Sequence, residues 1–461
     1  MLVGCCLALF IISLDATIVN VALPTLQTSL HASVSGLQWV IDSYTLVLAS
    51  LLLLAGSAGD RIGRRTLFQV GLAVFAIGSL ACSLAPNLGT LIAFRMLQAV
   101  GGAMLQPNAL STITNVITDP TRRAHAIGIW AGVFGIAAAS GPILGGILVA
   151  TVGWRAIFWV NLPVVAAAFV LVARYAPETK TPRPRRVDLP GQLLLIGTLA
   201  ALTYAVIEGP ARGWGSAMIV GPFAVAAVGL ATFVLVERRQ AEPLLELRFF
   251  RSPPFTGAAS MATLAFAILA GFLFLNTLYL QEVRGDSALM AGIATLPATV
   301  VIAVVSPLTG RLVARRGSRF PMTAAGFFLA GGALVLSRDS ADSSYLFLAV
   351  GYVLLGLGFA LINPPITNTA VAGMPKDQAG VASAVATSSR QLGNVLGVAI
   401  IGSVVTSQLH HIPYVGFTTA SHTGWDLAVA AGLAIAVIAY LTTRADPGQD
   451  RECLARNLTP R

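Results

Sequence analysis

Fourteen apolar segments run through this 461-residue chain, and they decide the solvent in which it folds. The hydrocarbon core of a bilayer is about 30 Å thick, and a helix needs roughly 20 apolar residues to cross it. Alternating segments of strand length, which would predict a membrane barrel, are absent from the sequence. We therefore expect an all-α polytopic membrane protein with spans at residues 2–23, 38–58, 67–85, 88–109, 123–150, 154–174, 189–208, 217–236, 255–280, 288–314, 320–337, 344–372, 379–407 and 423–442.

The basic residues fall in every second gap between these spans. Of the 29 lysines and arginines, 23 lie in one set of gaps and at the termini, four lie in the other set and two lie inside spans. Basic residues stay on the cytoplasmic face while a membrane protein inserts. The pattern predicts a multi-pass protein with both termini in the cytoplasm.

Composition and missing motifs exclude several classes of function. Charged residues make up only 10% of the chain, so the net charge of +10 reports membrane topology rather than a nucleic-acid partner. Neither lysine, Lys180 nor Lys376, lies in a glycine-rich phosphate loop, which argues against ATP as an energy source. Hydrolase triads, CxxC and HExxH patterns are missing as well. We expect no enzyme activity, no cofactor and no metal.

Two polar stretches divide the spans into groups of six, two and six. The first stretch is rich in proline and charge, and the second precedes the last six spans. The predicted organisation is an N-terminal six-helix bundle (1–176), a cytoplasmic linker (177–190), two inserted transmembrane helices (191–236), a second cytoplasmic linker (237–254), a C-terminal six-helix bundle (255–442) and a cytoplasmic tail (443–461).

The two groups of six carry a weak internal repeat. The loop that begins at Gly56 after the second span and the loop that begins at Gly310 after the tenth share glycines and arginines at an offset of 254 residues. Asp60 in the first loop is replaced by Ala314 in the second. Repeats of this kind build the two rocking halves of many transporters, although coincidence between two short Gly/Arg-rich loops is the alternative.

An ionisable residue inside a span costs several kcal/mol and is therefore a functional candidate. Asp15 lies in the first span, and Arg95 lies in the fourth with Gln98 three residues further along the same helix face. Burial disfavours a carboxylate charge whereas a nearby cation favours it, and this tension suits a group that binds and releases a proton. We expect Asp15 and Arg95 to couple transport to protons; a fixed structural ion pair is the alternative.

Other polar residues in or near spans are candidates for a substrate cavity. Asp42 lies near the external end of its span, where an ordinary hydrated acid is an equal alternative. Arg390 and Gln391 lie deep in the thirteenth span and are expected to line the cavity of the second half. The full candidate set is Asn20, Asp42, Gln98, Asn161, Gln281, Arg390 and Gln391.

Two segments are candidates for conformational gating. The loop after the second span mixes one acid with several arginines, which indicates a charge latch or only a topogenic signal. The fifth span carries small residues at four-residue spacing and a proline, which indicate a close contact between halves or ordinary helix packing. The candidate gating residues are Gly56, Asp60, Arg61, Gly63, Arg64, Gly141, Pro142 and Gly145.

At these motifs the chain resembles the 14-span drug:proton antiporter family of the major facilitator superfamily, in particular its actinobacterial antibiotic and multidrug exporters. The resemblance covers nearly the whole chain and is carried by eight motifs in order: LDATIVNVALP, GDRIGRR, RMLQAVGGA, SGPILGG, WRAIFWVNLP, EGPARGW, YLQEVRG and ASAVATSSRQLG. It implies two six-helix bundles with two inserted helices and alternating access. Asp15 and Arg95 match the family's acid and arginine, and Gly141 and Pro142 match its antiporter motif.

The resemblance also implies the function: proton-driven export of hydrophobic drugs or antibiotics across the plasma (inner) membrane of a bacterium, by a monomer. Ala99 departs from the glycine usual at that position, and spans nine to thirteen contain no central acid. The second departure argues against polyvalent cations and favours neutral, weakly basic or zwitterionic compounds. The alternatives are a proton-coupled uptake symporter or facilitator for a small metabolite and a non-transporting membrane sensor or scaffold.

Overall fold

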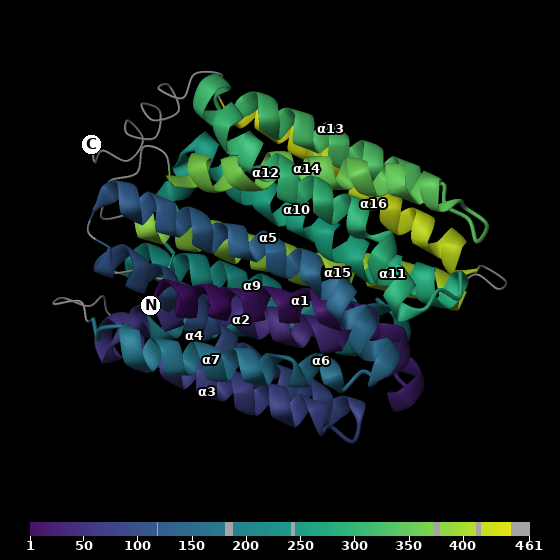
Figure 1. Cartoon of the computed structure of the whole chain (residues 1–461). Coiled ribbons are helices and arrows are strands. Elements are labelled where there is room, and N and C mark those ends of the chain that lie inside the picture. The colour runs from purple at the N-terminus through teal and green to yellow at the C-terminus, as the bar shows by residue number, and fades with distance from the viewer. Residues whose placement is uncertain (118, 180–187, 241–244, 372–378, 412–415, 444–461) are drawn as a thin grey trace. The chain divides into compact units, whose positions relative to one another are not determined.

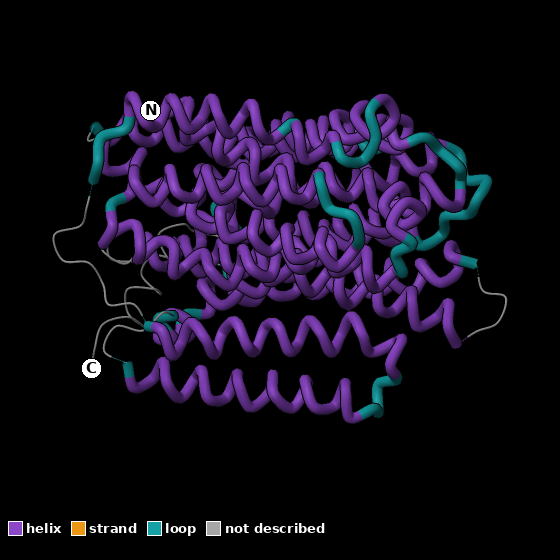
Figure 2. Tube along the Cα trace, turned by 90° about the horizontal axis from the view of Figure 1, so that it is seen from below, coloured by secondary structure: helices purple, strands orange, loops and turns teal. Residues whose placement is uncertain are grey.

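The computed structural model describes the whole chain except residues 118, 180–187, 241–244, 372–378, 412–415 and 444–461. The middle parts of both predicted linkers and nearly all of the predicted tail therefore lie outside the described residues. Within the described residues every regular element is a helix, and no strand occurs (Figure 2). The predicted all-α fold is confirmed.

Most of the predicted spans correspond to one long helix each. They are α1 (Leu2–Leu30), α2 (Val34–Ile62), α3 (Arg64–Ser83), α4 (Leu88–Val116), α5 (Pro120–Thr151), α8 (Leu189–Arg212), α9 (Ala217–Arg239), α10 (Pro253–Leu278), α13 (Arg319–Leu336), α14 (Tyr345–Val371), α15 (Ala379–His411) and α16 (Phe417–Thr442). Several of these helices extend beyond the predicted apolar window because polar residues continue the helix to its capping residue. α4, for example, begins at Leu88 as predicted and continues past residue 109 to Val116. At its start, Asn87 forms a capping box in which its side chain accepts from the Thr90 N–H.

Two predicted spans are built from two helices each. The sixth span consists of α6 (Ala156–Trp159) and α7 (Asn161–Tyr175), and the tenth consists of α11 (Ala288–Ala294) and α12 (Leu296–Arg316). In the ninth span, α10 continues into a π-helical turn, η2 (Tyr279–Val283). A short 3₁₀ helix, η1 (Leu247–Arg251), comes before α10. The helix break before α7 directly precedes Asn161, the first residue of that helix.

Twelve described segments are long and apolar enough to cross a membrane. They coincide with twelve of the fourteen predicted spans. The other two predicted spans lie in α5 and α15, which are 32 and 33 residues long. Multi-pass membrane insertion is therefore the consequence of the helix lengths as well as of the composition.

The chain divides into two compact units. Unit 1 contains residues 1–200 and 285–293, and unit 2 contains residues 201–284 and 294–461. Within unit 1, α1 packs against α5 and α7, α4 packs against α2 and α3, and α7 also packs against α3 (Figure 1). Within unit 2, α10 packs against α15 and α16, α14 packs against α12 and α13, and α16 also packs against α13.

These packing partners follow the internal repeat. If α1, α2, α3, α4, α5 and α7 correspond to α10, α12, α13, α14, α15 and α16, each of these helix pairs in unit 1 has its counterpart in unit 2. The weak loop similarity is thus accompanied by the same order of contacts in two sets of six spans. The predicted domain boundaries at single residues stay predictions.

Candidate functional site

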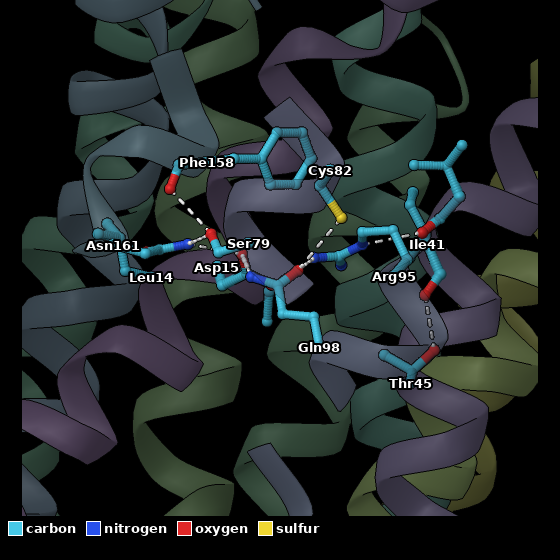
Figure 3. A network of polar contacts seen from close by, with 12 residues as sticks. Leu14, Asp15, Ile41, Thr45, Ser79, Cys82, Arg95, Gln98, Phe158 and Asn161 are labelled. Carbon is cyan, nitrogen blue, oxygen red and sulfur yellow. Dashed lines mark hydrogen bonds and ion pairs between the residues drawn. The ribbon is translucent and has the colours of Figure 1, made fainter. Parts of the chain in front are cut away.

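Asp15 and Arg95 form an ion pair in the interior of unit 1. Asp15 lies on α1 and Arg95 on α4, and their side chains are 0% and 2% exposed. The Arg95 Nη1 donates a hydrogen bond to Asp15 Oδ2 (Figure 3). A buried pair of this kind is costly to break, because either charge alone in a low-dielectric interior loses its compensation. The structure brings together the two residues expected to couple protons.

The second oxygen of Asp15 has two further partners. The Gln98 Nε2 donates to Asp15 Oδ1 over 2.9 Å, and the Asn161 Nδ2 donates to the same oxygen over 3.1 Å. Gln98 comes from α4, and Asn161 is the first residue of α7 after the helix break. The carboxyl group therefore receives hydrogen bonds from one guanidinium and two amides.

The guanidinium of Arg95 has further partners. Its Nη1 donates to Gln98 Oε1 over 2.9 Å, and its Nε donates to the carbonyl oxygen of Val40 over 3.3 Å. Its Cζ lies 4.1 Å from the ring centroid of Tyr44, so the face of a tyrosine covers the cation. Both Val40 and Tyr44 belong to α2, and the pair therefore joins α1, α2 and α4.

A second layer of side chains from α3 orients the amides. Ser79 donates to the carbonyl oxygen of Phe158 over 2.8 Å and lies 3.1 Å from the Asn161 Nδ2, which donates to it. The Cys82 Sγ lies 3.9 Å from Gln98 Oε1. We name the whole set the Asp15 network: Asp15, Arg95, Gln98, Asn161, Tyr44, Ser79 and Cys82. Figure 3 labels all of these residues except Tyr44.

The remaining cavity candidates of unit 1 lie outside this network's hydrogen bonds. Asn20 donates to the carbonyl oxygens of Ala16 and Thr17 in its own helix, so its side chain is occupied locally. Asp42 is fully buried, and neither of its carboxylate oxygens has a hydrogen-bond partner among the described residues. The alternative of a hydrated acid at the span end therefore does not describe Asp42.

Three cavity candidates belong to unit 2. Gln281 is partly buried in the turn η2, and Arg390 and Gln391 are partly buried in α15. Gln391 Oε1 accepts from Asn394 Nδ2 over 3.3 Å. None of the three belongs to the Asp15 network, and their contact with a substrate stays a prediction.

The predicted latch residues meet at the turn between α2 and α3. Arg64 Nη2 lies 2.6 Å from Asp60 Oδ1, and Arg61 beside them is exposed. Gly63 between the helices has a φ of 122°, which a side chain would strain, and a Cβ there would lie 2.5 Å from Glu178 Oε1. Gly56, one helical turn before Asp60, is in ordinary contact with a proline of α4.

Glu178 caps the start of α3, a role that the sequence did not reveal. It accepts hydrogen bonds from the N–H groups of Arg65 and Thr66, each over 3.1 Å, and from the Thr66 hydroxyl over 2.6 Å. Partial burial opposes ionisation, but these bonds together with one from the Thr179 N–H lower the pKa of Glu178 below its ordinary value. The segment after α7 is thereby tied to the latch turn.

The small residues of α5 let two other helices approach its backbone. A Cβ on Gly141 would lie 2.0 Å from Thr17 Oγ1, and a Cβ on Gly145 would lie 2.9 Å from Ile18 Cγ1, so both glycines face α1. Thr17 and Ile18 follow Asp15 within one turn. The gating candidates of α5 are therefore placed directly against the helix that carries the buried acid.

The same segment of α5 is equally close to α11. A Cβ on Gly146 would lie 2.7 Å from the carbonyl oxygen of Ala288, and a Cβ on Gly292 would lie 2.3 Å from the carbonyl oxygen of Pro142. Only glycine fits at such distances from backbone atoms. Gly141, Pro142 and Gly145 thus belong to a backbone-to-backbone contact within unit 1, and their gating role stays a prediction.

A sequence model of the Major Facilitator Superfamily matches residues 5–398, from α1 into α15. The chain belongs to the Major Facilitator Superfamily. This membership confirms the resemblance inferred from the eight motifs, and it places the chain among membrane transporters rather than enzymes.

Several curated members of the superfamily are similar over most of this chain. The multidrug resistance protein Stp of Mycobacterium tuberculosis is 42% identical over 404 residues, which cover 87% of this chain and 75% of that protein. The tetracenomycin C resistance and export protein of Streptomyces glaucescens is 38% identical over 88% of this chain and 76% of its own length. The methylenomycin A resistance protein of Streptomyces coelicolor is 36% identical over 93% of this chain and 87% of its own length.

Solved structures of the superfamily share the fold. A D-xylose–proton symporter aligns with a TM-score of 0.70 over 96% of this chain and 97% of its own, at 13% sequence identity. A bacterial homologue of the human lysosomal transporter Spinster aligns with a TM-score of 0.66 over 99% of this chain and 97% of its own, at 16% sequence identity. At such identities the likeness concerns the fold of this superfamily member and not its substrate.

Proposed function

We propose that this member of the Major Facilitator Superfamily exports hydrophobic drugs or antibiotics across the plasma membrane of a bacterium in exchange for protons. The observation that carries the proposal is the fully buried Asp15, whose carboxylate is bound by Arg95, Gln98 and Asn161. The similar proteins are named as resistance and export proteins, which supports export as the direction. We further propose a monomer with both termini in the cytoplasm.

The Asp15 network offers two states that differ by one proton. When Asp15 is ionised, its two oxygens tie α1 to α4 and α7. When a proton neutralises Asp15, Arg95 keeps only Gln98, the Val40 carbonyl and the Tyr44 ring, and the tie between α1 and α4 weakens. The free energy of proton binding to Asp15 therefore differs between a conformation in which α1 contacts α4 and α7 and one in which these helices separate.

Export follows if drug and proton favour opposite conformations. A drug entering from the cytoplasm binds the state in which Asp15 is ionised, and a proton entering from the more acidic outside favours release of the drug and return of the empty transporter. α5 packs closely on α1, because Gly141 lies against Thr17 and Gly145 lies against Ile18. A movement of α1 therefore also displaces α5. Each change of state is then driven by differential binding and not by ATP.

The test is drug-dependent collapse of a pH gradient in inside-out membrane vesicles. Wild type, Asp15→Asn and the control Asp342→Asn, which changes an exposed acid in the α13–α14 turn, are compared with a panel of hydrophobic antibiotics and dyes. We expect proton release on drug addition in wild type and in Asp342→Asn, and none in Asp15→Asn. Proton movement in the direction of an uptake symporter, or full coupling in Asp15→Asn, contradicts the proposal.

A further inference from the structure

Unit 2 contains a partly buried arginine, Arg390, whose charge has no carboxylate partner among the described residues. Arg390 lies on α15, 11 residues after its first residue Ala379, which is about 16 Å along the helix axis. Its Nη2 donates to the Thr367 hydroxyl and lies 3.5 Å from the carbonyl oxygen of Asn363, both on α14. Its Cζ lies 5.7 Å from the ring centroid of Phe266 on α10. These partners are neutral.

The rest of the guanidinium has no partner in the described part of the chain. The Arg390 Nε is buried and makes no hydrogen bond there, and no carboxylate of a described residue pairs with Arg390. The contrast with Arg95 is complete, because the guanidinium of Arg95 binds a carboxylate oxygen, an amide oxygen and a backbone carbonyl.

The surrounding helices offer no acid to supply the missing charge. The sequences of α10, α14 and α15 contain neither aspartate nor glutamate. α16 also packs against α15, and its one acid, Asp426, is exposed. Glu208 on α8 forms an ion pair with Arg212, 2.9 Å between Oε2 and Nε. These helices therefore place no described carboxylate beside Arg390 that could compensate its charge.

Several polar side chains lie beside Arg390 in the sequence of α15. The Ser388 hydroxyl is buried and has no hydrogen-bond partner among the described residues. Gln391 and Asn394 are partly buried and bond to each other. Ser389 donates to the Val385 carbonyl of its own helix. The planar guanidinium, with donors aligned in a fork, is the only charged group of this cluster, and such a fork matches the two oxygens of a carboxylate.

We propose that Arg390 binds an acidic oxygen group, such as a carboxylate or enolate, of the compounds that this transporter carries. The proposal rests on the proposed drug export and names the substrate class at one site of unit 2. A bound anion compensates the guanidinium charge that the described protein leaves uncompensated, and Phe266 supplies an apolar surface beside it. Zwitterionic compounds with an acid near an aromatic ring fit this arrangement.

Two dyes isolate the acidic group from the rest of the substrate. Rhodamine 110 and rhodamine 123 share one xanthene fluorophore, and they differ in that the carboxylate of the first is a methyl ester in the second. Energised uptake of each dye into inside-out vesicles gives a specificity ratio for kcat/KM. We expect wild type to favour rhodamine 110 by about tenfold, the effect of one charge-assisted pair.

Three variants test the origin of the ratio. In Arg390→Gln the ratio should fall to about one while rhodamine 123 is still exported. In Arg390→Lys, which keeps the charge but loses the fork, an intermediate ratio is expected. The control Arg251→Gln applies the same change to an exposed arginine of η1 and should keep the wild-type ratio.

The outcomes separate this inference from the proposed function. If Arg390→Gln exports both dyes with the wild-type ratio, or if it lowers both rates equally while the purified protein remains monodisperse, Arg390 does not bind the acidic group and the inference is wrong. If wild type favours the ester, the inference is also wrong, but proton-coupled export stands. If wild type exports neither dye nor any compound of the drug panel, the proposed function itself fails, and with it the inference.

Discussion

Tyr352 on α14 donates its hydroxyl to Asn276 on α10, and both side chains are buried in unit 2. By the internal repeat, α10 and α14 correspond to α1 and α4 of unit 1, where Arg95 donates to Asp15. The same helix contact is therefore made by two neutral side chains in unit 2 and by an aspartate and an arginine in unit 1. This asymmetry agrees with the proposal that the proton binds in unit 1.

Replacement of Tyr352 by phenylalanine tests that asymmetry. Tyr352→Phe removes a neutral hydrogen bond between helices, and such bonds contribute about 1 kcal/mol to stability. We expect a slightly lower melting temperature in detergent and unchanged stoichiometry of protons released per drug in vesicles. A loss of proton release with export retained would show that unit 2 also takes part in coupling.

The ion pair of Asp15 and Arg95 predicts a non-additive pair of substitutions. Arg95→Gln leaves the buried carboxylate without its cation and should destabilise the protein by about 3–5 kcal/mol. Adding Asp15→Asn removes the stranded charge and should restore most of the melting temperature, whereas drug-dependent proton release stays lost. Equal instability of the single and double variants would mean that the two charges do not compensate each other.

The contact between α5 and α1 predicts a position-specific effect of one methyl group. A Cβ on Gly141 would lie 2.0 Å from Thr17 Oγ1 and 2.8 Å from Thr17 Cβ, so Gly141→Ala must push α1 and α5 apart. Overpacking of this kind costs about 1–3 kcal/mol. Gly132→Ala on the same helix is the control, because nothing lies within 4 Å of its added Cβ.

Transport rates of the two glycine variants in vesicles, measured at equal protein content, give the readout. We expect a strong loss of drug-dependent proton release in Gly141→Ala and a normal rate in Gly132→Ala. Thr17→Gly in the Gly141→Ala background should recover part of the rate, because it removes both clashing atoms. Equal rates in wild type and Gly141→Ala would contradict a role for this close contact.

Asp339 in the turn between α13 and α14 predicts a pH dependence of stability. Burial raises the pKa of Asp339 from 3.8 to about 6, against the opposing effect of His422, whose Nε2 lies 3.4 Å from Asp339 Oδ1. The other ionisable groups near it are Tyr279 and Arg284 after α10 and Tyr352 on α14. The protonated carboxyl is therefore the form that the fold prefers.

Because the folded pKa lies above the ordinary value, this preference stabilises the protein fully below about pH 4 and is lost as the pH rises through about 6. Asp339→Asn cannot lose a proton. The melting temperature of wild type minus that of Asp339→Asn should therefore fall between pH 4 and pH 7, by the equivalent of about 1–3 kcal/mol. Asp342→Asn, an exposed acid in the same turn, should show no such change. Parallel melting curves for wild type and Asp339→Asn would contradict the assignment.

Most of the fold could be predicted from the sequence because membrane helices are recognised by their length and hydropathy. The predicted spans differ from the helices mainly at their ends. α4, for example, begins at Leu88 as predicted but continues to Val116, past the end of its predicted window at residue 109. The break before Asn161 and the break at Thr295 were not predicted, because both flanking segments are equally apolar and hydropathy does not register a local change of helix direction.

The site was predicted in part. Asp15 and Arg95 are found from sequence because a charge inside a span is rare and needs a partner. Ser79 and Cys82 were missed, because small neutral residues on α3 carry no signal until α7 places Asn161 beside them. Glu178 was missed because it lies 113 residues from the backbone N–H of Arg65 that it caps. The burial of Asp42 was likewise decided by packing and not by its place in the span.

The central claim is that Asp15 carries the proton exchanged for drug. Its most direct test is the proton release measured when a transported drug is added to the purified protein in weakly buffered detergent solution, with wild type, Asp15→Asn and Asp342→Asn side by side. The account predicts that drug binding releases protons from wild type and from Asp342→Asn, and that Asp15→Asn binds the drug without releasing any. Proton release from Asp15→Asn equal to that of wild type would contradict it.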